Sequence, residues 1–175
     1  MKKFELTNEF VTNMFGTKLF RIRALVEFGD VEAGELGGYV EKESNLGHDD
    51  NAWVYGDARV YDNALVYDNA RVYGDAQVSG DARVSGNARV CGNGDYAYAH
   101  GFGSVNRTTT FFRLKDGGVG VRCGCFYGTL AQFRDKIRET HGETKKAQEY
   151  LMLADLMELR FEEDENEVGN RKYVE

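Results

Sequence analysis

The chain has 175 residues, which is enough for one ordinary domain or two small ones and too few for a large enzyme core. It contains 21 glycines and no proline, so proline-rich linkers and cis-proline turns are excluded. The formal net charge is -7. The segment with a positive balance, residues 107–160, holds ten basic and seven acidic side chains. General binding to DNA needs a strongly basic surface, so we do not expect it.

Two further features of the sequence concern the compartment. No run approaches eighteen apolar residues, and residues 1–10 lack the apolar core of a signal peptide. The cysteines are Cys91, Cys123 and Cys125, an odd number that forms no disulfide framework, so we expect reduced thiols. The sequence therefore predicts a cytoplasmic protein without membrane association.

The N-terminal segment, residues 1–36, is predicted to form a β cap. Apolar side chains alternate with others from Phe20 to Phe28, which is typical of a half-buried strand. An open solenoid exposes strand edges at its ends, so this strand is expected to close the first coil of the repeat that follows.

A repeat of six residues organises residues 37–106. Valines recur at an unbroken spacing of six, and an alanine stands two residues before each of them. The valines are Val54, Val60, Val66, Val72, Val78, Val84 and Val90. Alternation places Ala and Val on one side of a short extended segment, whereas steps of 100° per residue would scatter the valines around a helix. Pairs such as Gly56-Asp57 and Asp62-Asn63 predict sharp bends, because these residue types accept positive φ.

This block resembles the hexapeptide-repeat family of left-handed parallel β-helices. The resemblance implies a left-handed triangular coil of three hexapeptides, or eighteen residues. Tyr96 and Phe102 extend the spacing of six and predict nine rungs, which make three coils. Val40 and Leu46 continue the spacing on the other side, but Leu46 lies eight residues before Val54, which predicts a two-residue insertion within residues 47–51.

The layout of nearly the whole chain also resembles repeat proteins of phages and prophages. The stretch from Leu36 to Glu41, followed by Asn45-Leu46 and then by the repeats, carries this second resemblance. It implies a phage-encoded protein that acts in the host cytoplasm, and it brings no established activity with it.

Residues 107–160 are predicted to form a ββαα domain that docks on the last coil, since a unit of this size is too small to fold reliably alone. Two strands, residues 108–114 and 119–125, are joined by a hairpin at residues 115–118. Thr129 begins a capping box, which predicts a helix that ends near Gly142, and a second helix follows from Lys145 to Arg160. Residues 161–175 are expected to be a disordered acidic tail.

Outward side chains of the repeat predict a surface for self-association. A period of eighteen stacks two arginines with a tryptophan in one outward column, and tyrosines stand in the column beside it. The predicted interface residues are Trp53, Tyr55, Tyr61, Tyr67, Arg71, Tyr73 and Arg89. Four outward tyrosines are more aromatic surface than a monomer usually exposes, so we expect a homo-oligomer. The alternatives are a face that binds a stacked base or an anion, and ladders that stabilise neighbouring coils without any partner.

The junction between the repeat and the C-terminal domain is the predicted ligand site. Arginine side chains and a helix N-terminus both attract anions such as phosphate. The predicted ligand-binding residues are Ser104, Asn106, Arg107, Arg122 and Thr129. The alternative is a polar connection whose Asn, Ser and Thr side chains satisfy the backbone, with Thr129 as a plain N-cap.

The histidines and cysteines allow two other interpretations. A hexapeptide-repeat acyltransferase that uses acyl-CoA needs a histidine base, and His100 stands in the repeat register, so this enzyme is the alternative function. A metal site like that of hexapeptide-repeat carbonic anhydrases needs three converging histidines, whereas His48, His100 and His141 occupy unrelated positions. A single Cys-x-Cys, Cys123 and Cys125, is a weak signal for zinc, so we expect no metal and no cofactor.

The sequence thus predicts a mainly β protein with a short left-handed parallel β-helix of about three coils, an N-terminal β cap and a C-terminal ββαα domain. Its expected function is that of a non-enzymatic, oligomeric binding protein. The expected partner is a host factor that it sequesters or inhibits, either a host protein or a small anionic or nucleotide signal.

Overall fold

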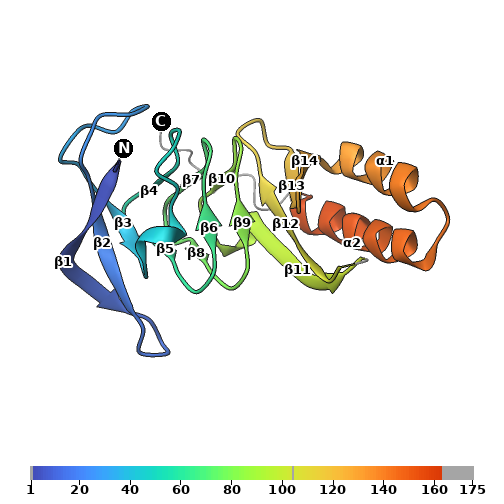
Figure 1. Ribbon diagram of the computed structural model, residues 1–175, viewed down its shortest axis with the longest axis horizontal. Helices are drawn as coiled ribbons and strands as arrows, with labels where there is room; N and C mark the ends of the chain where they lie inside the picture. The colour runs from blue at the N-terminus through green and yellow to red at the C-terminus, as the bar shows by residue number, and fades with distance from the viewer. Residues whose placement is uncertain (1, 104, 163–175) are drawn as a thin grey trace.

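A computed structural model describes residues 2–103 and 105–162. Figure 1 shows an elongated molecule in which a solenoid lies between an N-terminal β cap and a C-terminal sheet that carries helices α1 and α2. The N-terminal strands are β1 (Phe4–Thr12), β2 (Lys18–Ala24) and β3 (Leu36–Val40). The solenoid continues with η1 (Glu43–Asn45), β4 (Trp53–Val54), β5 (Arg59–Val60), β6 (Leu65–Val66), β7 (Arg71–Val72), β8 (Gln77–Val78), β9 (Arg83–Val84), β10 (Arg89–Val90) and η2 (Asn93–Asp95). The C-terminal part contains β11 (Tyr96–Phe102), β12 (Arg107–Arg113), β13 (Val119–Cys123), β14 (Phe126–Thr129), α1 (Leu130–His141) and α2 (Lys145–Phe161).

Parallel strands form three sides of the described solenoid. The first side contains β3, β5 and β8, the second contains β4, β7 and β10, and the third contains β6 and β9. Residues that pair on the second side lie eighteen positions apart, because Trp53 pairs with Arg71 and Arg71 pairs with Arg89. The parallel β-solenoid with an eighteen-residue period is therefore confirmed.

The first coil contains the predicted two-residue insertion. Val40 pairs with Val60 and Leu46 bridges to Val66, so both partners are twenty positions apart instead of eighteen. Asn45 lies at the end of η1 and is fully buried, and its side-chain amide donates to the carbonyl of Ala64 over 2.8 Å. This side chain therefore joins the longer coil to the next one.

The interior of the solenoid consists of the alanines and valines of the repeat. Every alanine from Ala52 to Ala88 in this register and every valine from Val54 to Val90 is buried in one core. The corner residues Gly56, Asp62, Asp68, Gly74, Gly80 and Gly86 adopt positive φ, as the corner pairs predict. The Asp62 carboxylate also accepts the Gly80 N–H over 3.1 Å, which joins successive coils at one corner.

The N-terminal cap is an antiparallel extension of the first side. β1 pairs with β2, and β2 pairs with β3. The predicted strand over residues 20–28 is confirmed as far as Ala24 and is wrong beyond it, because the Leu25 N–H bonds to the Lys3 carbonyl and the chain turns at the Phe28–Val31 bridge. β1 was not predicted from the sequence.

The solenoid ends earlier than the sequence predicts. Tyr96 and Phe102 are not rungs, because they belong to β11, which pairs antiparallel with β12. The cause is the packing of β12 on the last coil, where Ala88 forms an antiparallel bridge with Leu114 and Phe112 is buried in the solenoid core. Inward positions from Val40 to Val90 still make three coils.

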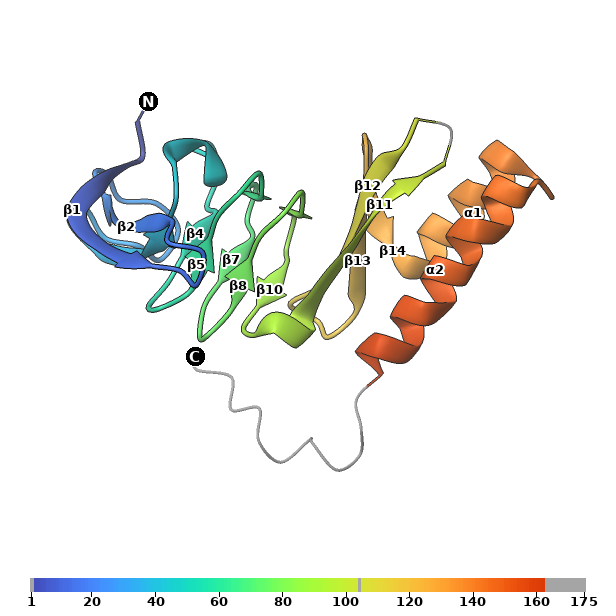
Figure 2. The same cartoon turned by 90° about the horizontal axis from the view of Figure 1, so that it is seen from below.

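The C-terminal part is a four-stranded antiparallel sheet with the order β11-β12-β13-β14, covered by α1 and α2. One face of the sheet lies against the last coil and the other face carries the helices (Figure 2). The predicted ββαα domain is therefore incomplete, because β11 and β14 complete the sheet and the strand over residues 119–125 ends at Cys123. Both helices and the capping box at Thr129 are confirmed.

A second apolar core lies between this sheet and the helices. Phe111 and Val121 contribute from the strands, and Leu130, Phe133 and Ile137 contribute one stripe of α1. Within the described residues no helix has the length and apolar character needed to cross a membrane. Most of the predicted acidic tail, residues 163–175, lies outside the described residues.

Candidate functional site

The column of Trp53, Arg71 and Arg89 is present, but its first member does not face solvent. Trp53 is fully buried, because Phe28 packs against its ring with centroids 5.3 Å apart and Phe4 packs at 6.2 Å. The prediction that Trp53 lies on an accessible face is therefore wrong. The N-terminal cap covers this part of the second side.

Asp30 holds the next two residues of this side. The Arg71 guanidinium lies 2.5 Å from the Asp30 carboxylate, and the Tyr55 hydroxyl donates to the same carboxylate over 3.1 Å. Burial on its own raises the pKa of Asp30, but the hydrogen bond and charge of Arg71 outweigh it and hold that pKa below its usual value. Burial raises the pKa of Tyr55. These two side chains are therefore engaged within the protein.

The four predicted interface tyrosines do not share one face. Tyr55 and Tyr73 lie eighteen positions apart and follow the second side, whereas Tyr61 follows the first side and Tyr67 the third. The Arg122 guanidinium lies 5.4 Å above the Tyr67 ring, which places this tyrosine beneath the C-terminal sheet. Arg89, on the second side, donates to the carbonyl of Asn69 over 3.1 Å. A homo-oligomer through these residues stays a prediction.

The predicted anion-binding residues are not brought together at one point. Arg107 lies at the end of β12 that pairs with Phe102, whereas Thr129 pairs with Gly120 at the other end of the sheet. Arg122 faces the solenoid over Tyr67, as described above. Thr129 caps α1, because its hydroxyl accepts the Gln132 N–H over 3.3 Å.

Of the two remaining residues of this prediction, Asn106 lies just before β12. Asn106 has a φ of 48°, so its backbone is in the left-handed conformation that asparagine tolerates. Ser104 lies outside the described residues. Arg107 lines the two hollows described below, and Thr129 lines a third hollow at the other end of the sheet.

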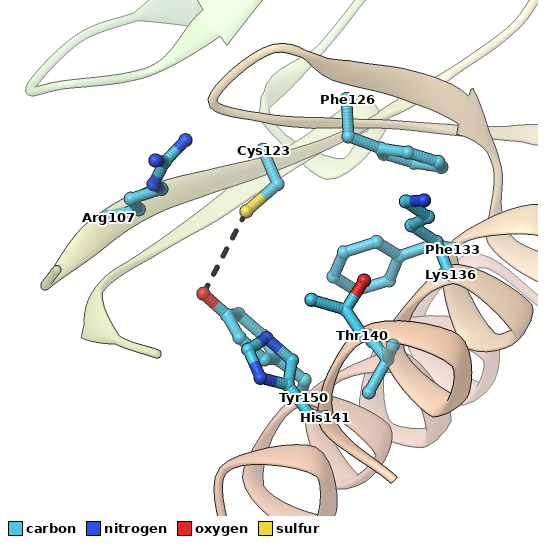
Figure 3. Close-up of a pocket in the computed structure, with 9 residues that line it drawn as sticks. Arg107, Cys123, Phe126, Phe133, Lys136, Thr140, His141 and Tyr150 are labelled. Carbon is cyan, nitrogen blue, oxygen red and sulfur yellow. Dashed lines mark hydrogen bonds between the residues drawn. The ribbon is translucent and has the colours of Figure 1, made fainter. Parts of the chain in front are cut away.

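One hollow, which we call the helix pocket, lies between the C-terminal sheet and the two helices and has a volume of about 230 Å³. Figure 3 shows its side chains, which come from β12, β13, β14, α1 and α2. The pocket is lined by Arg107, Cys123, Phe126, Phe133, Lys136, Ile137, Thr140, His141 and Tyr150.

Aromatic rings form one wall of the helix pocket. The ring centroids of Phe126 and Phe133 are 5.6 Å apart, and Phe133 meets Tyr150 edge-on at 5.8 Å. His141 stacks on Tyr150 with an interplanar angle of 25°. These rings converge because the stripe of α1 that packs on the sheet ends at the pocket. A flat apolar group fits against such a wall.

A short chain of hydrogen bonds forms the polar floor of the pocket. Thr109 donates to the Cys123 sulfur over 3.2 Å, the Cys123 thiol points to the Tyr150 hydroxyl at 3.9 Å, and that hydroxyl donates to the carbonyl of Phe102 over 3.2 Å. Burial, with a smaller contribution from Cys123, raises the pKa of Tyr150 to about 12. The Tyr150 hydroxyl is therefore protonated at neutral pH and serves as a donor.

Two cationic side chains flank this pocket. Lys136 is exposed and lies 2.7 Å from the Glu139 carboxylate, so its charge is already paired. The Arg107 guanidinium is also exposed and has no ion-pair partner among the residues that the structure describes. Arg107 is thus the cation that is available for an anionic ligand.

A second hollow, which we call the coil pocket, lies between the last coil and the turn of β11 and β12 and has a volume of about 480 Å³. His100 is exposed there, and its Nδ1 is 2.8 Å from the Thr108 hydroxyl and 4.0 Å from the Asp81 carboxylate. The coil pocket is lined by Asn63, Asp81, Arg83, His100, Val105, Arg107, Thr108 and Gly124. His100 is therefore a strand residue at a pocket and not an inward rung.

Two glycines that position the site were not predicted from the sequence. Gly124 has a φ of 59°, and a Cβ atom there would collide with the Arg107 guanidinium, so glycine lets the arginine lie across the turn between β13 and β14. A Cβ atom on Gly103 would collide with the Tyr150 hydroxyl. The signal in the sequence was only that both glycines lie in turns.

The described cysteines and histidines do not assemble a metal centre. In residues 2–103 and 105–162, no three His, Cys, Asp or Glu side chains are grouped so that they could hold a metal ion. Cys125 is exposed in the turn after β13, whereas Cys123 faces the helix pocket.

The repeat of the solenoid is similar to a known repeat family. A family model described as the YdcK β-solenoid repeat matches residues 52–67, 58–74, 64–80 and 76–92. These matches cover β4 to β10 and do not extend to the N-terminal cap or to the C-terminal sheet and helices. No curated protein matches the chain. The central part of this protein is therefore similar to a β-solenoid repeat family, and both candidate pockets involve residues outside the matched segment.

Proposed function

We propose that this protein is a non-enzymatic binding protein that holds a small anionic ligand with a flat ring, such as a nucleotide, in the helix pocket. The observation that carries the proposal is the Arg107 guanidinium, which has no ion-pair partner in the described part of the chain, at the edge of a pocket with an aromatic wall. A nucleotide combines these two needs, because its phosphate is an anion and its base is flat.

The energetics favour such a ligand. A charge-assisted hydrogen bond contributes about 1.5 to 3 kcal/mol, and stacking of a base on an aromatic ring contributes roughly 1 to 3 kcal/mol. The phosphate contact belongs to Arg107, and the base lies against Phe126 and Phe133. The proton of the Tyr150 hydroxyl is already donated to the Phe102 carbonyl, so this side chain contributes its ring and not a further donor to the ligand.

The proposal extends to the biological role and to the assembly. The solenoid is a rigid support, and among the described residues that line the helix pocket the Cys123 thiol contacts Tyr150 and no histidine base, so we propose sequestration of a host signal by a phage-encoded protein. We also propose that the repeat belongs to the left-handed hexapeptide class, which the small residue, any residue and aliphatic residue of each unit supports. We propose, last, that the protein self-associates through the second side of the solenoid.

Calorimetric titration tests the ligand site. AMP, cyclic AMP and acetyl-CoA are titrated into the wild-type protein and into the variants Arg107→Ala and Arg138→Ala. Arg138 is the matched control, because it is an exposed arginine of α1 that pairs with Asp135 and does not line the pocket. We expect a nucleotide to bind, Arg107→Ala to weaken it about tenfold or more, and Arg138→Ala to leave it unchanged. Equal affinity of all three proteins would contradict the proposed site.

An acyltransferase is the second candidate, and one observation favours it. His100 is exposed at the coil pocket, where its Nδ1 lies 2.8 Å from the Thr108 hydroxyl and 4.0 Å from the Asp81 carboxylate, so a histidine base is present beside a polar pocket. If the enzyme interpretation holds, the wild-type protein releases free CoA from acetyl-CoA in the presence of an amine acceptor, and His100→Gln abolishes this release. Absence of CoA release across a panel of acceptors favours the binding protein.

A further inference from the structure

We infer that the ligand has two parts and passes from the helix pocket, across Arg107, into the coil pocket, so that it is a nucleoside diphosphate joined to a second sugar. This inference rests on the proposed function, because it takes the helix pocket as the site of the base. It assigns the coil pocket to the second sugar and the Arg107 guanidinium to the phosphates between the two.

Arg107 is the residue that connects the two pockets. It lines both of them, while the pockets lie on opposite faces of the C-terminal sheet. Both pockets lie at the same end of the sheet, where the β11–β12 turn and the β13–β14 turn are found. The guanidinium lies across Gly124 at the ends of the strands, and Figure 3 shows it beside the helix pocket near Cys123. Because Arg107 also lines the coil pocket, a ligand can contact it from either face.

The coil pocket has the chemistry of a sugar site. Most of its described lining consists of hydrogen-bonding side chains. Val105 is the aliphatic residue of this lining, and the imidazole of His100 is its aromatic ring. Asp81 accepts from the Asn63 amide over 3.2 Å and still has carboxylate lone pairs for sugar hydroxyls. Arg83 is exposed in the same pocket and has no ion-pair partner among the residues that the structure describes.

The two pockets differ in their lining and in their size, and these differences indicate which class of ligand fits. Phenyl rings line the helix pocket, whereas the described lining of the coil pocket has none, so a second base would find only the smaller His100 ring or an arginine to stack on. The coil pocket is also the larger of the two, at about 480 Å³ against about 230 Å³. A base on the helix side and a hydroxyl-rich sugar on the coil side therefore match the two linings. A dinucleotide with two bases matches them less well.

Titration with adenosine compounds of increasing length tests this inference. AMP, ADP and ADP-ribose are titrated into the wild-type protein, Asp81→Asn, Arg83→Gln and two control variants, Asp75→Asn and Arg59→Gln. The controls make the same changes at a corner and on a strand of the solenoid away from the coil pocket. The thermal unfolding midpoint of each variant is measured to show that it is folded.

We expect ADP-ribose to bind about tenfold or more tightly than ADP, because it adds the sugar contacts. Asp81→Asn and Arg83→Gln should each weaken ADP-ribose about tenfold and leave AMP unchanged, while the controls change neither. If ADP-ribose binds no more tightly than ADP and both pocket variants bind it like the wild type, the two-part ligand is wrong and the proposed mononucleotide site stands. If none of the three compounds binds, the proposed nucleotide function is wrong, and this inference is wrong with it.

Discussion

At the scale of single residues, Lys3 is a charged group whose burial disfavours the protonated form. Lys3 is almost fully buried beneath the N-terminal cap, and its ammonium group donates to the carbonyl of Ala52 over 2.8 Å. Burial lowers the pKa of Lys3 from 10.5 to about 8, although the charges of Asp50 and Asp49 act in the opposite direction. The cap over Trp53 therefore contains a charge that destabilises the folded state at neutral pH.

This lowered pKa predicts how stability changes with pH. Between pH 8 and 10.5 the unfolded chain holds a proton on Lys3 that the folded protein has released, so the free energy of unfolding rises with pH in this window. Relative to Lys3→Met, which has no proton to release, the wild type should gain roughly 1 kcal/mol or more, after allowance for solvent screening. Urea unfolding of both proteins at pH 7.5 and pH 10.5 measures the difference. A difference that is constant across this window would show that the pKa of Lys3 is not lowered.

At the scale of the elements, the repeat could be predicted because each of its units is local. The inward Ala and Val and the corner residues with positive φ lie within six residues of one another, so the sequence specifies each unit without tertiary contacts. β11 was misassigned because Tyr96 and Phe102 happen to lie six residues apart inside a strand that pairs antiparallel. β14 was missed because its four residues overlap the capping signal at Thr129.

The buried register gives a direct prediction for one strand. Val72 is fully buried in β7, so Val72→Asp puts an unpaired charge into the core and should destabilise the protein by about 4 kcal/mol or more. Gln77 begins β8 and is half-buried on the outside, so Gln77→Asp should change stability by about 0.5 kcal/mol at most. Thermal unfolding followed by circular dichroism checks both variants. Equal midpoints would contradict the register described here.

At the scale of the whole molecule, tertiary packing decides which predicted site residues lie close together, and this could not be predicted from the sequence. Arg107 was predicted to be a ligand residue together with Arg122 and Thr129, because arginines and a helix N-terminus all attract anions. The pleat and length of the strands separate the three residues. The helix pocket was not predicted, since its walls come from α1, α2 and three strands that meet only in the folded protein. The same holds for the outward tyrosines, which the corners of the solenoid distribute over different sides.

This distribution sharpens the prediction for assembly. If the second side of the solenoid is the interface, sedimentation velocity should show an oligomer, and Tyr73→Ser should weaken self-association at least tenfold. Tyr61→Ser is the matched control, because Tyr61 follows the first side and should leave association unchanged. A wild-type protein that remains monomeric at high concentration, or equal loss in both variants, would contradict assembly through this side.

The central claim is that Arg107 binds the anionic group of a ligand, and the affinity of ADP-ribose for the wild-type protein and for Arg107→Ala tests it most directly. Arg107 makes no ion pair within the described residues, so its replacement removes a ligand contact and leaves no buried charge behind. We predict a dissociation constant that rises about tenfold or more in Arg107→Ala, with an unchanged unfolding midpoint. The same dissociation constant for both folded proteins would contradict the claim.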